Sequence, residues 1–126
     1  MSLDFSLSKP ISRRECVCTC GHKHEADHSE EVASFNITHN LCAMAQAAGI
    51  YGCLWHPEEQ NPPITTAGQC VSPLRAGLAA MKADPQRFRP MSASNGWGTY
   101  EQFLPWLELV LAACEADTDA LVSASI

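Results

Sequence analysis

The feature that most constrains the fold of this chain is a helical spacing of apolar residues that begins near residue 36. Five apolar residues recur at i, i+4, i+7, i+8 and i+11, which places them on one helical stripe: Ile37, Leu41, Met44, Ala45 and Ala48. Asn36 or Thr38 can act as the N-cap, because each side-chain oxygen can accept from a free backbone N–H, and Gly49 supplies a C-terminal stop. The sequence therefore predicts a helix over residues 36–48.

Two further helices are predicted from capping patterns. Ser72-Pro73 has the form of an N-cap followed by proline at the first helical position, which predicts a helix over 73–83. Because a proline disrupts a helix interior, the capping-box pattern at 66–69 is assigned to a separate short turn at 66–71. Thr99-x-x-Gln102 caps the last helix, whose buried face is predicted to hold Phe103, Leu107, Val110 and Cys114.

Strands are predicted where apolar and polar residues alternate with period two. Residues 3–8 and 32–37 show this alternation, and 120–126 is expected to form a closing strand beside 3–8.

The chain has 126 residues, of which 46% are hydrophobic and 17% charged, an ordinary balance for one globular domain. The predicted fold is α+β, with about three helices on a small, mostly antiparallel sheet; a strand and a Cys/His-rich arm occupy 1–31, and the body occupies 32–126.

The arm contains a cluster of residues that can bind metal. Cys16, Cys18 and Cys20 would project from one face of an extended chain, and a turn at the following glycine could bring His22 or His24 back toward the sulfurs. Thiolate and imidazole are the ligands that zinc prefers, and one tetrahedral ion can hold a short arm that has little core. The sequence predicts a zinc site here; the alternatives are a reduced, metal-free polar hairpin and a cluster that picks up metal only during purification.

Charge and hydropathy limit the partners and the compartment. Eight Lys plus Arg against fourteen Asp plus Glu give a formal charge of −6, which disfavours direct binding to nucleic acid. No apolar run reaches the roughly 20 residues that span a bilayer, and no secretion signal is recognised. We expect a cytoplasmic protein without a membrane segment or a disulfide framework.

Three motifs resemble those of a family of small uncharacterised proteins encoded by bacteria and their phages. They are Asn-Ile-Thr-His-Asn-Leu-x-x-Met-Ala-x-x-Ala-Gly-Ile-Tyr at 36–51, Leu-Trp-x-Pro-Glu-Glu at 54–59 and Asn-Gly-Trp-Gly-Thr-Tyr-Glu at 95–101. The resemblance covers roughly residues 32–126 and leaves the Cys/His arm outside. It implies a shared scaffold and an origin in mobile elements, and it implies no chemistry.

Polar and aromatic residues at helix starts and tight loops form a candidate ligand-binding cluster. Its members are Asn36, His39, Asn40, Trp55, Glu58, Asn95 and Trp97. Aromatic faces can stack on a planar small molecule such as a nucleotide base while amides and an imidazole bond its edges. The structural alternative is that the tryptophans fill the core and the Asn and His residues serve as caps and loop braces.

A hydrolase is a further alternative for the same region. In one version His39 or His56 would act as the base and Glu58 would orient it; in the other, Cys53 would act as the nucleophile. No nucleophile elbow or phosphate-binding loop accompanies these residues.

The favoured function is a non-enzymatic accessory protein that binds another protein, such as a host complex that a phage occupies as a counter-defence. Glu101, Glu108 and Glu115 recur every seven residues and would lie about 10.5 Å apart along one edge of the last helix. This acidic ridge could follow a basic groove on the partner, although a simple solvated helix face is the favoured explanation of the spacing.

Overall fold

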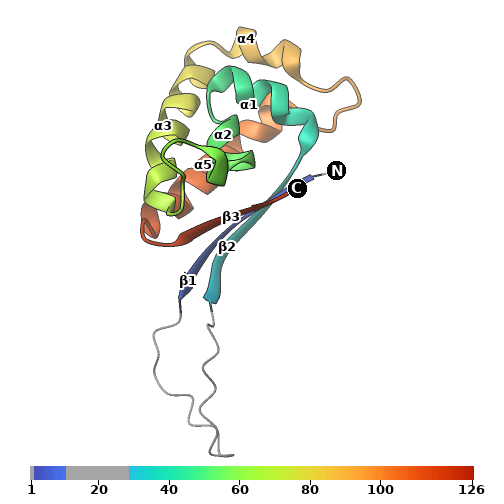
Figure 1. The fold of residues 1–126 in the computed structure, drawn as a ribbon. Helices are drawn as coiled ribbons and strands as arrows, with labels where there is room; N and C mark the ends of the chain where they lie inside the picture. Colours follow the sequence, from blue (N-terminus) through green and yellow to red (C-terminus); the bar gives the residue numbers. More distant parts are fainter. Residues whose placement is uncertain (1, 11–28) are drawn as a thin grey trace, which may run out of the picture.

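A three-stranded antiparallel sheet carries the helices on one of its faces (Figure 1). The computed structural model describes residues 2–10 and 29–126, so the predicted zinc ligands at 16–24 lie outside the described residues. The strands are β1 (Ser2–Pro10), β2 (Ser29–Thr38) and β3 (Leu121–Ser125), in the order β2-β1-β3. The closing strand predicted beside residues 3–8 is thereby confirmed, with Phe5 opposite both Phe35 and Ala124.

The helical layer of the described chain contains three helices of seven or more residues and several short ones. In chain order they are η1 (His39–Leu41), α1 (Cys42–Ala48), α2 (Tyr51–Trp55), η2 (Pro57–Glu59), α3 (Ala67–Ala83), α4 (Pro85–Phe88), η3 (Arg89–Met91) and α5 (Tyr100–Ala116). The protein is α+β, as predicted from the sequence. None of the described helices has the length and apolar content needed to cross a bilayer.

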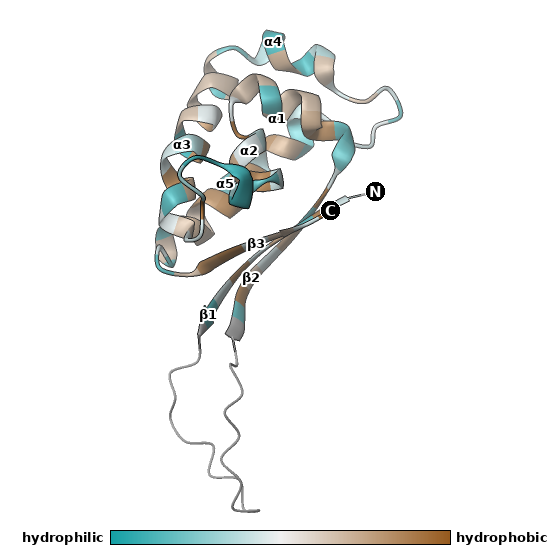
Figure 2. Cartoon of the chain, viewed as in Figure 1, coloured by the Kyte–Doolittle hydropathy of each residue, from teal (hydrophilic) through white to brown (hydrophobic). Residues whose placement is uncertain are grey.

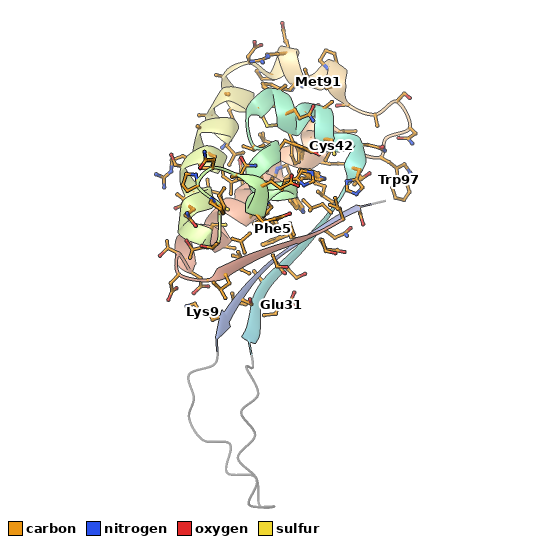
Figure 3. The ribbon with its side chains drawn as sticks, viewed as in Figure 1. Phe5, Lys9, Glu31, Cys42, Met91 and Trp97 are labelled. Carbon is orange, nitrogen blue, oxygen red and sulfur yellow. The ribbon has the colours of Figure 1, made fainter. Side chains whose placement is uncertain are left out.

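The core lies between the sheet and the helices. Leu3, Phe5 and Leu7 alternate along β1 and are fully buried, whereas Asp4 between them is exposed. Phe5 points from the sheet toward the helices in Figure 3. Figure 2 shows the hydrophobic residues concentrated in the helices and in the strands that they cover. The opposite face of the sheet is polar, as is usual for an antiparallel sheet with one solvated side.

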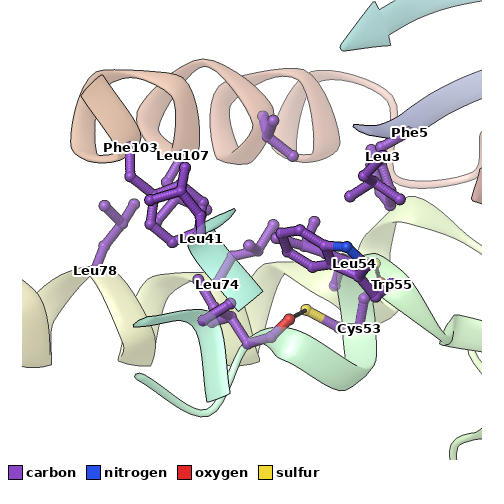
Figure 4. Packing of buried hydrophobic residues seen from close by; sticks show 14 of the residues in the cluster. Leu3, Phe5, Leu41, Cys53, Leu54, Trp55, Leu74, Leu78, Phe103 and Leu107 are labelled. Carbon is purple, nitrogen blue, oxygen red and sulfur yellow. Dashed lines mark hydrogen bonds between the residues drawn. The ribbon is translucent and has the colours of Figure 1, made fainter. Parts of the chain in front are cut away.

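Large apolar side chains from different helices meet above the sheet (Figure 4). Trp55 of α2 is only 2% exposed and packs in the same cluster as Leu41, Leu74 and Phe103. The structural alternative is therefore correct for Trp55, whose ring belongs to the core.

The helix predicted to begin at residue 36 begins three residues later. Asn36 and Ile37 continue β2, where they pair with Asp4 and Leu3 of β1. Thr38 is the cap, because its side chain accepts from the N–H of Asn40. Of the two predicted caps, Thr38 is therefore correct and Asn36 is not. The helical assignment of residues 36–37 is wrong, whereas the strand predicted over 32–37 is confirmed, because pairing with β1 decides between the two structures.

The predicted break between residues 71 and 73 is also wrong, because α3 runs through Pro73 without interruption. Thr66 and Gln69 form a capping box at the start of this single helix. The apolar face of the helix continues on both sides of the proline, with Cys70 and Leu74 fully buried. Packing of that face outweighs the cost of one missing helical hydrogen bond.

Candidate functional site

A groove of about 860 Å³ opens where the end of β2 meets the loop before α5. This volume lies within the usual range for ligand sites. Its described lining comes from the start of β1, the junction of β2 with η1, the loop and the first turn of α5: Ser2, Asn36, Ile37, Thr38, Asn40, Asn95, Gly96, Trp97, Gly98 and Gln102. Four residues of the predicted ligand-binding cluster, Asn36, Asn40, Asn95 and Trp97, are therefore brought together. None of these lining side chains is charged.

Trp97 projects from the rim of this groove (Figure 3). Trp97 is 71% exposed, whereas tryptophan residues are highly buried on average. The backbone around it is nevertheless held in place. The N–H of Trp97 donates to Asn95 Oδ1 at 3.0 Å, and its carbonyl accepts from Asn40 Nδ2 at 2.8 Å. The loop thus presents a free indole on a braced backbone.

Gly98 brings this loop close to the start of η1. Its φ of +102° lies in the region that favours glycine, and a Cβ added there would stand 3.0 Å from Thr38 Cγ2 and 3.1 Å from Asn40 Cβ. The Asn-Gly-Trp-Gly pattern therefore serves both the turn and the close approach of two segments.

Each amide side chain of the groove forms hydrogen bonds within the described part of the chain through only one of its two polar atoms, the oxygen or the nitrogen. Asn36 Nδ2 donates to Ser2 Oγ at 3.0 Å and to Asp4 Oδ1 at 2.7 Å, and Gln102 Oε1 accepts from the N–H of Gly98 at 3.1 Å. Four amide atoms have no hydrogen-bond partner among the described residues: Asn36 Oδ1, Asn40 Oδ1, Asn95 Nδ2 and Gln102 Nε2. Two acceptors and two donors of the lining residues are thus not used in hydrogen bonds with the described residues.

His39 and Trp55 form a separate pair that does not line the groove. Trp55 Nε1 donates to His39 Nδ1 at 2.9 Å. An indole N–H can only donate, so this nitrogen of His39 acts as an acceptor. The Cys42 thiol lies 3.9 Å from the same nitrogen, and burial raises the pKa of that thiol. These contacts join η1, α1 and α2, and we assign the pair a structural role.

Glu58, the remaining predicted residue, lies on η2 beside His56 and Glu59. His56 Nδ1 is 3.3 Å from a carboxylate oxygen of Glu59, so Glu59 contacts the imidazole that Glu58 was expected to orient. Cys53 is 4% exposed and donates to the carbonyl of Ile50 at 3.2 Å. These contacts do not support Cys53 as an accessible nucleophile.

The acidic ridge faces a matching row of cations. Glu115 pairs with Arg75 at 3.4 Å, Glu108 with Lys82 at 2.8 Å, and Glu101 with Arg89 at 3.2 Å. The ridge therefore carries paired charges of both signs. Residues 75, 82 and 89 recur every seven positions, as 101, 108 and 115 do, and in antiparallel order. This shared spacing is a sequence signal that was missed.

Lys9 and Arg87 are the other two Lys and Arg residues in the described part of the chain. Lys9 Nζ lies 2.6 Å from Asp117, and the hydrogen bond with this carboxylate raises the pKa of the amine. Arg87 donates to the carbonyl of Ala47 at 3.4 Å. In the described part of the chain, four of the five Lys and Arg side chains thus face carboxylates, which leaves little positive surface for a phosphate backbone.

By fold and site, the chain is a small α+β protein with an uncharged polar groove and an exposed tryptophan at the rim. Comparison with protein-family models, with curated proteins and with solved structures found no match.

Proposed function

We propose that this chain is a non-enzymatic binding protein, that its partner is another protein, and that the groove rimmed by Trp97 is the contact surface. The observation that carries the proposal is the exposed indole on a braced loop. Tryptophan is enriched among the residues that dominate binding at protein interfaces. A backbone that is already ordered loses less entropy on binding.

The groove replaces the acidic ridge as the proposed contact. Each carboxylate of the ridge already has a Lys or Arg partner within the chain, so a basic surface would have to compete with those pairs. A host protein or complex remains the proposed partner, on the strength of the resemblance to phage and bacterial proteins. We propose that binding takes place in the cytoplasm and serves counter-defence.

A small neutral ligand is the second candidate occupant of the groove. The two free acceptors and two free donors could bond the edge of a base or another planar molecule while the indole stacks on its face. The uncharged lining favours a ligand without phosphate groups.

Capture of host proteins by the wild type and by Trp97→Ala tests the proposal. Loss of a tryptophan that dominates binding typically costs about 2 kcal/mol or more, which corresponds to roughly a thirtyfold weaker partner affinity. Leu109→Ala is the matched control, because Leu109 is 63% exposed and does not line the groove. A photo-crosslinking amino acid placed at position 97 should label the same partner, and one at position 109 should not.

The triple variant Glu101→Gln, Glu108→Gln, Glu115→Gln separates the two surfaces. We expect it to retain the partner. Equal capture by wild type and Trp97→Ala, together with loss in the triple variant, would return the contact to the ridge. A small molecule retained by the purified wild type and lost from Trp97→Ala would support the second candidate instead.

A further inference from the structure

His56, Glu58 and Glu59 bring three metal-ligand atoms together on the turn that follows α2. One ligand atom from each residue lies within 4.8 Å of the other two, and His56 Nδ1 is 3.3 Å from Glu59 Oε2. Donors around a tetrahedral ion with bonds of about 2.0 Å stand about 3.3 Å apart. Figure 2 shows the segment after α2 as strongly hydrophilic.

The imidazole is oriented by a contact on its other nitrogen. Tyr51 Oη lies 3.1 Å from His56 Nε2, and the Tyr51 ring stacks on Trp55 with centroids 5.5 Å apart. Metal-binding histidines commonly use the nitrogen that does not face the metal for a hydrogen bond of this kind, which fixes the ring and its tautomer. In the tautomer in which Nε2–H donates to the tyrosine oxygen, the lone pair of Nδ1 faces the Glu59 carboxylate.

The backbone of the turn is fixed as well. Pro57 is buried, its carbonyl accepts from the N–H of Ile64 at 2.9 Å, and Gln60 Nε2 donates to the carbonyl of His56 at 3.0 Å. The three ligand residues are therefore held close together by contacts that do not involve their carboxylates.

No lysine or arginine of the described residues pairs with the carboxylates of this turn. Glu101, Glu108 and Glu115 each pair with a Lys or Arg, whereas Glu58 and Glu59 have no such partner in the described part of the chain. A divalent cation would supply the missing positive charge.

We propose that His56, Glu58 and Glu59 bind a divalent transition-metal ion of the zinc type, at a site made of other residues than the Trp97 groove and the predicted zinc ligands of the arm. One imidazole nitrogen with two carboxylate oxygens suits zinc, cobalt or nickel, whereas magnesium and calcium prefer oxygen ligands alone. The His56 side chain is 27% exposed and that of Glu59 is 68% exposed, so water can complete the coordination. The ion joins the turn to the end of α2.

Cobalt(II) titration of the full chain with Cys16, Cys18 and Cys20 replaced by Ser tests the site without thiolates from the arm. We expect saturable visible absorption without a thiolate-to-cobalt charge-transfer band, competition by zinc, and no competition by magnesium. His56→Gln and Glu59→Gln should each weaken the affinity about tenfold or more, and Tyr51→Phe should weaken it by about tenfold through the lost hydrogen bond.

Glu101→Gln is the matched control, because Glu101 is exposed to a similar degree as Glu59 and lies elsewhere. Circular dichroism of each variant checks that the fold is retained, and the exposed Glu59 gives a variant that leaves the core intact. Cobalt affinity that is equal in the parent and in the folded Glu59→Gln variant, or equally weakened by Glu101→Gln, would overturn the proposal. Partner capture is not part of this test, so the two proposals stand or fall separately.

Discussion

Gly98 is the residue on which the position of the Trp97 loop depends. We predict that Gly98→Ala lowers the free energy of unfolding by about 1–3 kcal/mol, because the new Cβ would crowd Thr38 and Asn40 at a positive φ. Gly96→Ala is the control, since Gly96 has a φ of +78° but nothing within 4 Å of an added Cβ. Its cost should be about 1 kcal/mol, from backbone strain alone. Urea unfolding measures both variants; equal costs would show that the loop does not press on η1.

Three buried thiols from α2, α3 and α5 lie in the core: Cys53, Cys70 and Cys114. For Cys70, the hydrogen bond with Cys114 lowers the pKa, but the hydrogen bond with Cys53 and burial outweigh it and raise the pKa to about 12. The hydrogen bond with Cys70 and burial also raise the pKa of Cys114. Both thiols are therefore neutral and unreactive in the folded protein at neutral pH.

These shifts predict a loss of stability in alkali. An unfolded thiol with the ordinary pKa of 9.0 ionises first, so the stability that Cys70 contributes is complete below pH 9 and is lost as the pH rises from 9 toward 12. The expected slope is about 1.4 kcal/mol per pH unit for each thiol. Urea unfolding at several alkaline pH values should show a shallower decline for Cys70→Ala than for the wild type. Identical slopes would mean that Cys70 ionises in the folded state.

At the scale of the elements, α3 shows how a local rule can be overruled. Pro73 lacks the N–H that would bond to the carbonyl of Gln69, yet the helix continues. We predict that Pro73→Ala raises the free energy of unfolding by about 1–3 kcal/mol, because it restores that bond. Pro85→Ala is the control: Pro85 is the first residue of α4, where proline is compatible with a helix, and no gain is expected. Thermal or urea unfolding measures both, and a destabilised Pro73→Ala would show that the proline ring contributes packing that alanine lacks.

Elements defined by local contacts were predictable from the sequence. The Thr99 and Gln102 capping box begins α5 as predicted, and Gly49, with a φ of +77°, ends α1. The boundary between β2 and η1 was predictable only in part: the Thr38 cap was one of two predicted caps, but residues 36 and 37 fit either structure until β1 pairs with them. Pairing with a strand elsewhere in the sequence leaves no pattern in the residues at the boundary itself.

The candidate site was predictable only in part for the same reason. Asn40 and Trp97 meet through a hydrogen bond between residues 57 positions apart, and Ser2 enters the groove through strand pairing. Period and capping patterns identify residues at loop ends, but they do not say which loops meet. The prediction therefore grouped Trp55 with Trp97, although one is in the core and the other on the surface.

At the scale of the whole molecule, the zinc prediction for the Cys/His arm remains to be tested. Pro10 pairs with Ser29, so β1 and β2 hold the two ends of the segment that contains the predicted ligands. Elemental analysis after dialysis against a weak chelator should find about one zinc per chain more in the wild type than in Cys18→Ser. Cys42→Ser is the control, because Cys42 lies on α1 and is not a predicted ligand. Unchanged zinc in Cys18→Ser would exclude the site.

The strand order β2-β1-β3 has a consequence for the growing polypeptide. β1 is the central strand, but β3 follows every other described element in the sequence. During translation, β1 can pair with β2 early, while its other edge stays open until residues 121–125 leave the ribosome. Open edges recruit strands from other chains. Nascent chains on one messenger RNA are thus most prone to pair with one another in the interval just before β3 emerges. Slow synthesis over residues 100–120 would prolong that interval.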